Sequence, residues 1–173
     1  MKAKSAQKNV LVSVVMGSDS DLPIMTEATK VLEEFGVEYE LILTSAHRAP
    51  ERTTKLATSA KKRGVKVIIV GAGAAAHLAG VIASQTPLPV IGVPIDATSL
   101  QGLDALLSTV QMPGGIPVAT MAIGKAGAKN AALFAVRILA LEDKAILEKL
   151  SAYIDKMARD VEKKQENISC RKS

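Results

Sequence analysis

The stretch Val10-Leu-Val-Ser-Val-Val-Met16, followed directly by Gly17-Ser-Asp-Ser-Asp21, decides the class of fold. Its first seven residues are almost continuously apolar and β-branched, which is typical of a strand buried on both faces of a parallel sheet. The five polar residues that follow indicate a turn. Apolar residues then recur at helical spacing as far as Phe35, and Gly36 is suited to end the helix.

The alternation of strands and helices continues along the chain. Further strands are expected at 39–44, 65–70, 89–93 and 118–123, and helices at 50–63, 78–85, 126–141 and from Ile146 to Val161. Thr98-Ser-Leu-Gln101 has the pattern of a capping box that starts another short helix. This order predicts an α/β fold with a parallel sheet of about five strands, helices on both faces and right-handed crossovers.

The chain is expected to form one domain at residues 10–162, between a basic tail at 1–9 and a polar tail at 163–173. The last helix is an extra element. It follows the helix at 126–141, which is expected to complete the cover of the sheet, and yet it still carries an apolar stripe. It packs either on its own domain or on a neighbouring subunit, and the second arrangement predicts an oligomer.

The net charge of +5 does not indicate a nucleic-acid-binding protein. Residues 1–9 contribute +3 and residues 162–173 contribute +2, so the body between them is neutral. Aromatic residues make up only 2% of the chain, which provides no stacking platform for single strands. No apolar run approaches the ~20 residues that span a bilayer, so no membrane partner is expected.

The few cysteine and histidine residues favour a cytoplasmic protein without a zinc cluster, and no spaced acidic loop suggests a carboxylate-only metal site, the alternative that stays open. Cys170 is the only cysteine and cannot form an internal disulfide, which fits a reducing compartment. With two histidines and one cysteine, the chain has too few ligands for a zinc cluster. The basic N-terminus is not followed by an apolar secretory segment, so no signal peptide is expected.

Unusual sequences follow the first three strands, where parallel sheets bind ligands. In Gly17–Asp21, the start of a helix suits a phosphate, Ser18 offers a hydroxyl donor, and Asp21 is suited to accept bonds from sugar hydroxyls. The alternative is structural, because Ser18 and Asp21 also have the spacing of a capping box.

The second segment is Ser45-Ala-His-Arg48. In extended chain Ser45 and His47 face the same way and can share one site, with Arg48 available for a phosphate. A histidine near neutral pKa suits proton transfer without a metal. The alternative is an ordinary loop histidine. A Ser–His nucleophile pair is disfavoured, because no third acidic partner is evident.

The third segment, Gly71-Ala-Gly-Ala-Ala-Ala76, fits a loose dinucleotide-binding pattern, but it follows the third strand rather than the first. Its small residues would equally let a flat heterocycle approach the backbone closely. His77 opens the next helix, where capping or packing is the simpler role. Lys125 and Lys129 either steer an anion to the strand ends or are merely solvated.

Taken in order, these segments resemble the class I 5-(carboxyamino)imidazole ribonucleotide mutases over residues 10–160. The resemblance rests on Gly17–Asp21, Ser45–Arg48, Gly71–Leu78, Gln111-Met-Pro-Gly-Gly-Ile-Pro117 and Ala122-Ile-Gly-Lys-Ala-Gly-Ala-Lys-Asn130. Several long motifs in the same order are specific, although any one alone is not.

The resemblance implies a flavodoxin-like three-layer α/β/α sandwich, assembled as a homo-octamer with sites at subunit contacts. It implies conversion of 5-(carboxyamino)imidazole ribonucleotide to 4-carboxy-5-aminoimidazole ribonucleotide in purine biosynthesis, without metal, nucleotide cofactor or biotin. The residues carried over are the catalytic His47 and Ser45 and the substrate-binding Ser18, Asp21, Arg48, Gly71, Gly73 and His77. His47 is expected to shuttle the proton, and a dry pocket at 71–76 to hold carbon dioxide.

The chain departs from the family pattern at three small residues. Ala49 stands where threonine is common, Ala74 where glycine is common and Ala79 where proline is common. The nearest rival function is that of a class II enzyme, which carboxylates aminoimidazole ribonucleotide directly with carbon dioxide; Arg48 and His77 favour class I. A non-catalytic nucleotide-binding module and a dinucleotide-dependent enzyme are two further rival functions.

Overall fold

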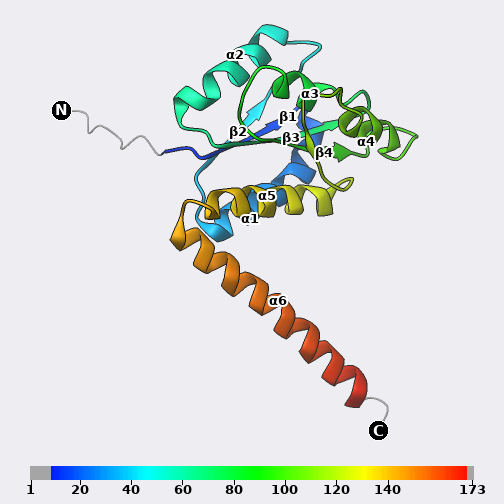
Figure 1. Cartoon of the computed structure of the whole chain (residues 1–173). Coiled ribbons are helices and arrows are strands. Elements are labelled where there is room, and N and C mark those ends of the chain that lie inside the picture. Colours follow the sequence, from blue (N-terminus) through cyan, green and yellow to red (C-terminus); the bar gives the residue numbers. More distant parts are fainter. Residues whose placement is uncertain (1–8, 171–173) are drawn as a thin grey trace, which may run out of the picture.

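The computed structural model, which describes residues 9–170, is an α/β sandwich around one parallel sheet (Figure 1). The strand order is β2-β1-β3-β4-β5, and all four pairings are parallel. The strands are β1 Val12–Met16, β2 Tyr39–Leu43, β3 Val67–Gly73, β4 Val90–Ile95 and β5 Ala119–Thr120. This is the doubly wound order of flavodoxin-like folds, and the predicted fold class is confirmed.

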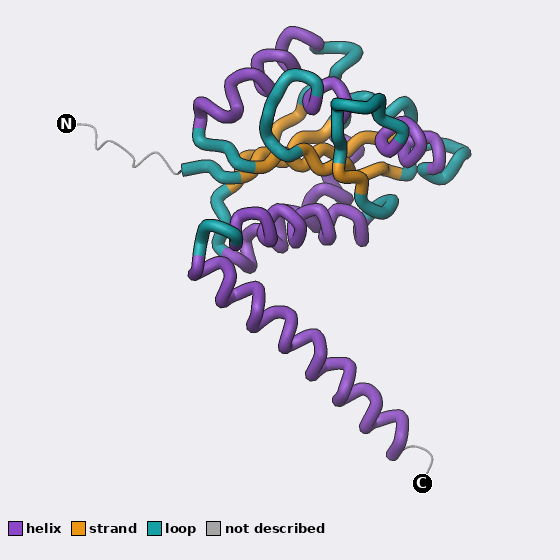
Figure 2. Tube along the Cα trace, in the orientation of Figure 1, coloured by secondary structure: helices purple, strands orange, loops and turns teal. Residues whose placement is uncertain are grey.

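Helices cover both faces of the sheet, with α1 and α5 on one side and α2, α3 and α4 on the other (Figures 1 and 2). The α-helices are α1 Leu22–Phe35, α2 Pro50–Ala60, α3 Leu78–Ala83, α4 Leu103–Val110, α5 Lys125–Ala140 and α6 Lys144–Cys170, and the 3-10 turns are η1 Asp19–Asp21 and η2 Lys61–Arg63. The arrangement gives the three layers that the alternating pattern predicts.

The burial of strand β1 explains why its sequence does not alternate between apolar and polar residues. All five of its residues are buried. Val12 and Val14 pack in the core shared with α1 and α5, whereas Val15 packs in the core shared with α2 and α3. At the end of α1, Gly36 adopts φ 70°, the left-handed conformation expected of a helix-ending glycine.

Two predicted elements differ from the structure. The segment 118–123 was expected to be a full strand, but only Ala119–Thr120 pairs as β5. Beyond it the chain stays beside β4 without regular pairing: the Met121 N–H donates to the Gly92 carbonyl at 2.8 Å and the Gly124 N–H to the Pro94 carbonyl at 2.9 Å. At residue 122 the backbone carbonyl lies against Gly127 of α5. The regular ladder of this edge strand stops after two residues.

The capping box predicted at Thr98–Gln101 is wrong. Gln101 and Gly102 both have positive φ, 51° and 83°, so the chain turns there and α4 begins only at Leu103. The Thr98 hydroxyl accepts a bond from the Leu100 N–H and donates one to the Asp104 carboxylate. It therefore orders a turn rather than a helix start.

The last helix, α6, is longer than its apolar pattern indicated. It continues through residues 163–170, which were expected to form a polar tail, and it projects from the body (Figure 1). Near its root, Ile146 and Leu150 are buried. Among the helices described, none is long and apolar enough to cross a membrane.

Replacing Gly127 by alanine tests the close packing of α5. The added Cβ would overlap the Ala122 carbonyl oxygen, and this is backbone that cannot rotate away. Although alanine is the better helix former, we expect Gly127→Ala to lower the free energy of unfolding by about 2 kcal/mol and Tm by about 5 °C. Gly114→Ala, whose Cβ meets no heavy atom within 4 Å, is the thermal-unfolding control. Equal Tm values for the two variants would contradict this account.

Candidate active site

The carboxyl ends of β1, β2 and β3 meet at one cavity. Met16, the last residue of β1, lies opposite Leu43, the last residue of β2, and opposite Gly71 of β3, which continues two residues further to Gly73. The loops that follow these strands enclose about 340 Å³. The lining residues are Gly17, Ser18, Ser20, Asp21, Ser45, Ala46, His47, Arg48, Ala72, Gly73, Ala74, Ala75, Leu78 and Ala97.

The first wall is the turn after β1. Ser18 and Asp21 form a capping box, in which the Ser18 N–H donates to Asp21 Oδ2 at 3.0 Å and the Ser18 hydroxyl accepts from the Ser20 N–H at 3.4 Å. The capping role expected from the spacing is therefore confirmed, and Ser18, Ser20 and Asp21 also line the cavity. The hydrogen bonds of the capping box stabilise the turn and at the same time place these polar groups against the cavity.

Asp21 is the buried ionisable group of this wall, with only 3% of its surface exposed. Burial raises the pKa of its carboxyl above the usual value, and the N–H groups of Ser18 and Gly17 partly oppose the shift by binding the charged form.

The second wall carries His47, which meets His77 from the start of α3. His47 Nε2 and His77 Nδ1 are 3.0 Å apart, and the rings meet edge to face with centroids 5.1 Å apart. One nitrogen of this pair must donate and the other accept. The His77 side chain makes no capping bond to α3, so the expected capping role does not describe it. This contact joins residues thirty apart in sequence.

Ser45 and Arg48 connect the first and second walls. The Ser45 hydroxyl accepts a bond from the Arg48 N–H at 3.2 Å, and the Arg48 guanidinium donates to the Gly17 carbonyl at 3.1 Å. Within residues 9–170, no hydrogen bond joins Ser45 to His47, so the two are neighbours in the cavity wall rather than a nucleophile and its base.

The two glycines predicted to bind substrate differ in position. Gly73 lines the cavity, and a Cβ there would lie 2.5 Å from the Cβ of Ala97. Gly71 is buried outside the lining, where a Cβ would collide with the Met25 side chain. The expectation that Gly71 contacts substrate is not supported by its position, because its lack of a side chain makes room for α1.

The three alanines at which the sequence departs from the pattern of the resemblance lie in different local settings. Ala74 adopts φ 52°, in the left-handed region that favours glycine. Ala49 is the N-cap of α2 and provides no side-chain cap, which a threonine there would supply. Ala79 is buried in α3. Ala74 lines the cavity, whereas Ala49 and Ala79 do not.

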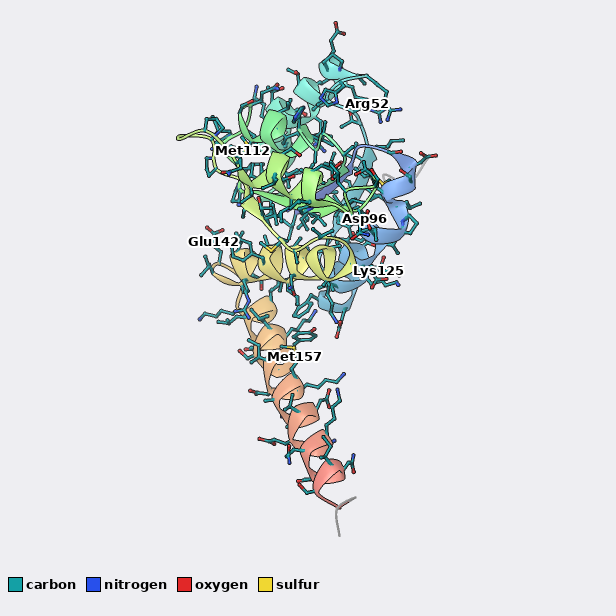
Figure 3. All side chains as sticks on the ribbon, turned by 90° about the vertical axis from the view of Figure 1, so that its right-hand side faces the viewer. Arg52, Asp96, Met112, Lys125, Glu142 and Met157 are labelled. Atoms are coloured by element: carbon teal, nitrogen blue, oxygen red, sulfur yellow. The ribbon has the colours of Figure 1, made fainter. Side chains whose placement is uncertain are left out.

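Sequence reasoning missed several residues around the cavity. Ser20 lies within Gly17–Asp21 but its sequence context predicts no role for it, and Ala97 carries no signal beyond its place after β4. Arg52 lines an adjoining hollow of about 500 Å³ with Arg48 and Asp19. Figure 3 shows Arg52 above and Lys125 below the level of Asp96. Neither Lys125 nor Lys129 lines the cavity.

The family model described as AIR carboxylase matches residues 11–160. The chain belongs to the AIR carboxylase family. The N5-carboxyaminoimidazole ribonucleotide mutase of Pyrococcus horikoshii is 60% identical over 158 residues, which are 91% of this chain and 88% of that protein. The same-named protein of Thermotoga maritima is 52% identical over 91% of both chains.

Other members of the AIR carboxylase family share the domain in different settings. The phosphoribosylaminoimidazole carboxylase of Saccharomyces cerevisiae is 52% identical over 87% of this chain, but the match covers only 26% of that longer protein. Among solved structures, Treponema denticola PurE superposes with a TM-score of 0.82 at 30% identity, covering 91% of this chain and 97% of that one. The fold around the cavity is therefore the fold of the AIR carboxylase family.

Asp21→Asn tests the electrostatics of the buried carboxyl. Because its folded-state pKa is raised, ionisation is less favourable in the folded protein than in the unfolded chain, and stability from this group falls as pH rises through that pKa. We expect the variant to have the higher Tm at pH 7. The gap should close as pH falls below the usual value of 3.8, where the carboxyl is protonated in both the folded protein and the unfolded chain. A lower Tm for the variant at pH 7 would contradict the shift.

Proposed function

We propose that this AIR carboxylase family member is an isomerase of purine biosynthesis, which converts 5-(carboxyamino)imidazole ribonucleotide to 4-carboxy-5-aminoimidazole ribonucleotide. The observation that carries the proposal is the His47–His77 contact beside a cavity that also holds Ser18, Asp21 and Arg48. The mutases of Pyrococcus horikoshii and Thermotoga maritima, which match nearly the whole chain, support the choice of reaction.

Different residues of the cavity are placed to bind the phosphate, the ribose and the imidazole ring of the ribonucleotide. Arg48 and the Ser18 hydroxyl are placed to bind the phosphate, since a guanidinium forms strong charge-assisted bonds to phosphate oxygens. Asp21 accepts bonds from the ribose hydroxyls. Gly73, with Ala97 behind it, lets the flat imidazole ring lie close to the backbone.

The reaction needs one proton carrier and no change of oxidation state. The bond between the exocyclic nitrogen and the carboxyl carbon breaks, its electrons stay on nitrogen, and His47 donates the proton that makes the amine. Ring carbon 4 then attacks the released carbon dioxide, and His47 removes the proton from that carbon to restore the aromatic ring. His47 ends as it began, so no metal, nucleotide cofactor or biotin enters the proposed cycle.

The other residues position this histidine. His77 holds the His47 ring by their 3.0 Å contact and thereby selects which nitrogen carries the proton. Ser45 fixes the backbone at Arg48, so its catalytic contribution is to the shape of the loop.

A homo-octamer in the cytoplasm is part of the proposal. In a single chain His47 and Arg48 are exposed, whereas released carbon dioxide must be kept beside the ring and water kept away. A subunit contact over the cavity would provide that cover. The single cysteine fits a reducing compartment.

Direct carboxylation of aminoimidazole ribonucleotide is the second candidate, because the Saccharomyces cerevisiae relative is named a carboxylase. Purified protein should be given each substrate separately while product absorbance is followed. We expect fast turnover of the carbamate and little turnover of aminoimidazole ribonucleotide at low bicarbonate. The opposite pattern would favour the carboxylase, and binding without turnover of either would indicate a nucleotide-binding module.

His47→Asn tests the proton carrier. Asparagine keeps a polar side chain but cannot shuttle a proton, so we expect substrate binding to persist while turnover falls about 100-fold or more. Lys62→Asn, on η2 away from the cavity lining, is the matched control and should keep wild-type turnover. Unchanged turnover in the His47 variant would remove this residue from the mechanism.

A further inference from the structure

The segment between β3 and α3, residues 74–77, forms a strained turn beside the cavity, and we call it the histidine loop because it ends at His77. Ala74 adopts φ 52°, a left-handed conformation that is unfavourable for alanine. The Ala76 N–H bonds to the Ala74 carbonyl and the His77 N–H to the Ala75 carbonyl, both at 2.8 Å, so two three-residue turns overlap. Strained backbone of this kind persists only where neighbouring structure holds it in place.

Ser108 of α4 supplies this support. The Ala76 N–H donates a hydrogen bond to Ser108 Oγ at 3.1 Å. The hydroxyl has one proton, and its shortest contact is with the Asp104 carbonyl at 2.6 Å, one turn earlier in the same helix. Its contacts with the Ala105 and Ala74 carbonyls are longer, 3.3 and 3.4 Å. The proton is therefore directed to α4, and a lone pair of the oxygen is left to face the histidine loop.

Helix α4 gives Ser108 a fixed base. The helix packs against β3 and β4, and its residues Ala105 and Thr109 are buried. Ala76 is only 2% exposed, so water has little access to its N–H. Among residues 9–170, no other side chain outside the histidine loop bonds to the loop's backbone. Without Ser108 this N–H would keep only its bent bond within the turn, and a poorly satisfied buried donor is costly.

The histidine loop leads directly to the proposed proton carrier. Ala76 is followed by His77, whose Nδ1 lies 3.0 Å from His47 Nε2. The His77 side chain makes no capping bond to α3, so its ring is placed by the backbone that carries it and by His47. A displaced loop would therefore weaken this contact. Ser108 lies outside the cavity lining and would act only through the loop.

We propose that Ser108 is a positioning residue, which holds the histidine loop through the Ala76 N–H and so keeps the His77 ring against His47. The proposal rests on the proposed function, in which His47 carries the proton and His77 orients its ring. It adds no chemical step, because Ser108 touches neither substrate nor reacting atoms. Its contribution is geometric, and small displacements of a catalytic group reduce the rate.

Turnover of the carbamate substrate tests the role of the hydroxyl. We expect Ser108→Ala to lower kcat about 10-fold, the scale of one lost hydrogen bond, with KM within about threefold because phosphate and ribose are bound from other loops. Ser108→Thr keeps the hydroxyl and should keep most of the turnover. Ser108→Cys, whose thiol is a weak acceptor, should lose turnover as alanine does and replaces Ser108→Ala if that variant does not fold.

Thr109→Val is the matched control. It removes a hydroxyl from the same helix, but that hydroxyl bonds to the Ala105 carbonyl at 2.7 Å and not to the histidine loop. We expect it to keep wild-type kcat. Wild-type kcat in Ser108→Ala, or an equal loss in Thr109→Val, would overturn the proposal.

A double-mutant cycle tests whether Ser108 acts through His77. If it does, adding Ser108→Ala to His77→Asn should lower kcat by less than about twofold further, because the ring that the loop positions is already absent. Two losses that multiply in the double variant would show that Ser108 acts by another route and would contradict the proposal.

Nuclear magnetic resonance of labelled histidine provides a measurement that does not depend on turnover. The chain has two histidines, so the ring signals come from His47 and His77 alone. At about pH 8 the neutral rings predominate, and a pair in which one nitrogen donates and the other accepts holds each ring in one main tautomer. We expect one main tautomer per ring in the wild type and in Thr109→Val, and tautomer averaging in Ser108→Ala. Unchanged ring signals in Ser108→Ala would overturn the proposal.

The two measurements separate this proposal from the proposed function. If the wild type turns over neither substrate but its ring signals respond to Ser108→Ala, the proposed reaction is wrong and the support of His77 by Ser108 stands. If the wild type turns over the carbamate and neither kcat nor the ring signals respond, the role of Ser108 alone is wrong.

Discussion

The parallel hydrogen bonding of β1 to β2 on one side and to β3 on the other sets the position of every group in the candidate site. Met16 is in register with Leu43 and with Gly71, so β1 and β2 leave the sheet at the same level and β3 leaves it two residues later, after Gly73. Ser18, His47 and Gly73 come from these three exits and reach one cavity although they are far apart in sequence. A shift of register in either pairing would separate them.

Close packing beneath the cavity depends on small residues. Gly71 leaves space for Met25 of α1, and Gly73 leaves space for Ala97. These contacts keep the β3 exit close to its neighbours, and the loop beyond it carries the chain to His77. The cavity floor is therefore a consequence of core packing, whereas its chemistry comes from a few polar side chains at the rim. At that rim the Ser18–Asp21 capping box fixes the turn, and burial of the same carboxyl raises its pKa.

The periodicity of the sequence predicted most of the fold, because β1 is buried on both faces and α1 has one apolar face that ends at Gly36. It also predicted the loops that form the cavity, since parallel strands end at a common edge. It failed in two places: Thr98 orders a turn before the positive φ angles of Gln101 and Gly102, and the edge strand β5 keeps only two regularly paired residues although Met121 and Gly124 still donate to β4. The pairing of His47 with His77 has no local signal at all.

The central claim is that His47 faces the reacting carbon of a bound ribonucleotide. A crystal structure with 4-carboxy-5-aminoimidazole ribonucleotide tests it most directly. The account predicts a His47 ring nitrogen within about 3.5 Å of ring carbon 4 or of the exocyclic nitrogen, with the phosphate held by Ser18 and Arg48. A nucleotide bound away from this cavity, or a His47 ring turned from the imidazole with no water between them, would contradict it.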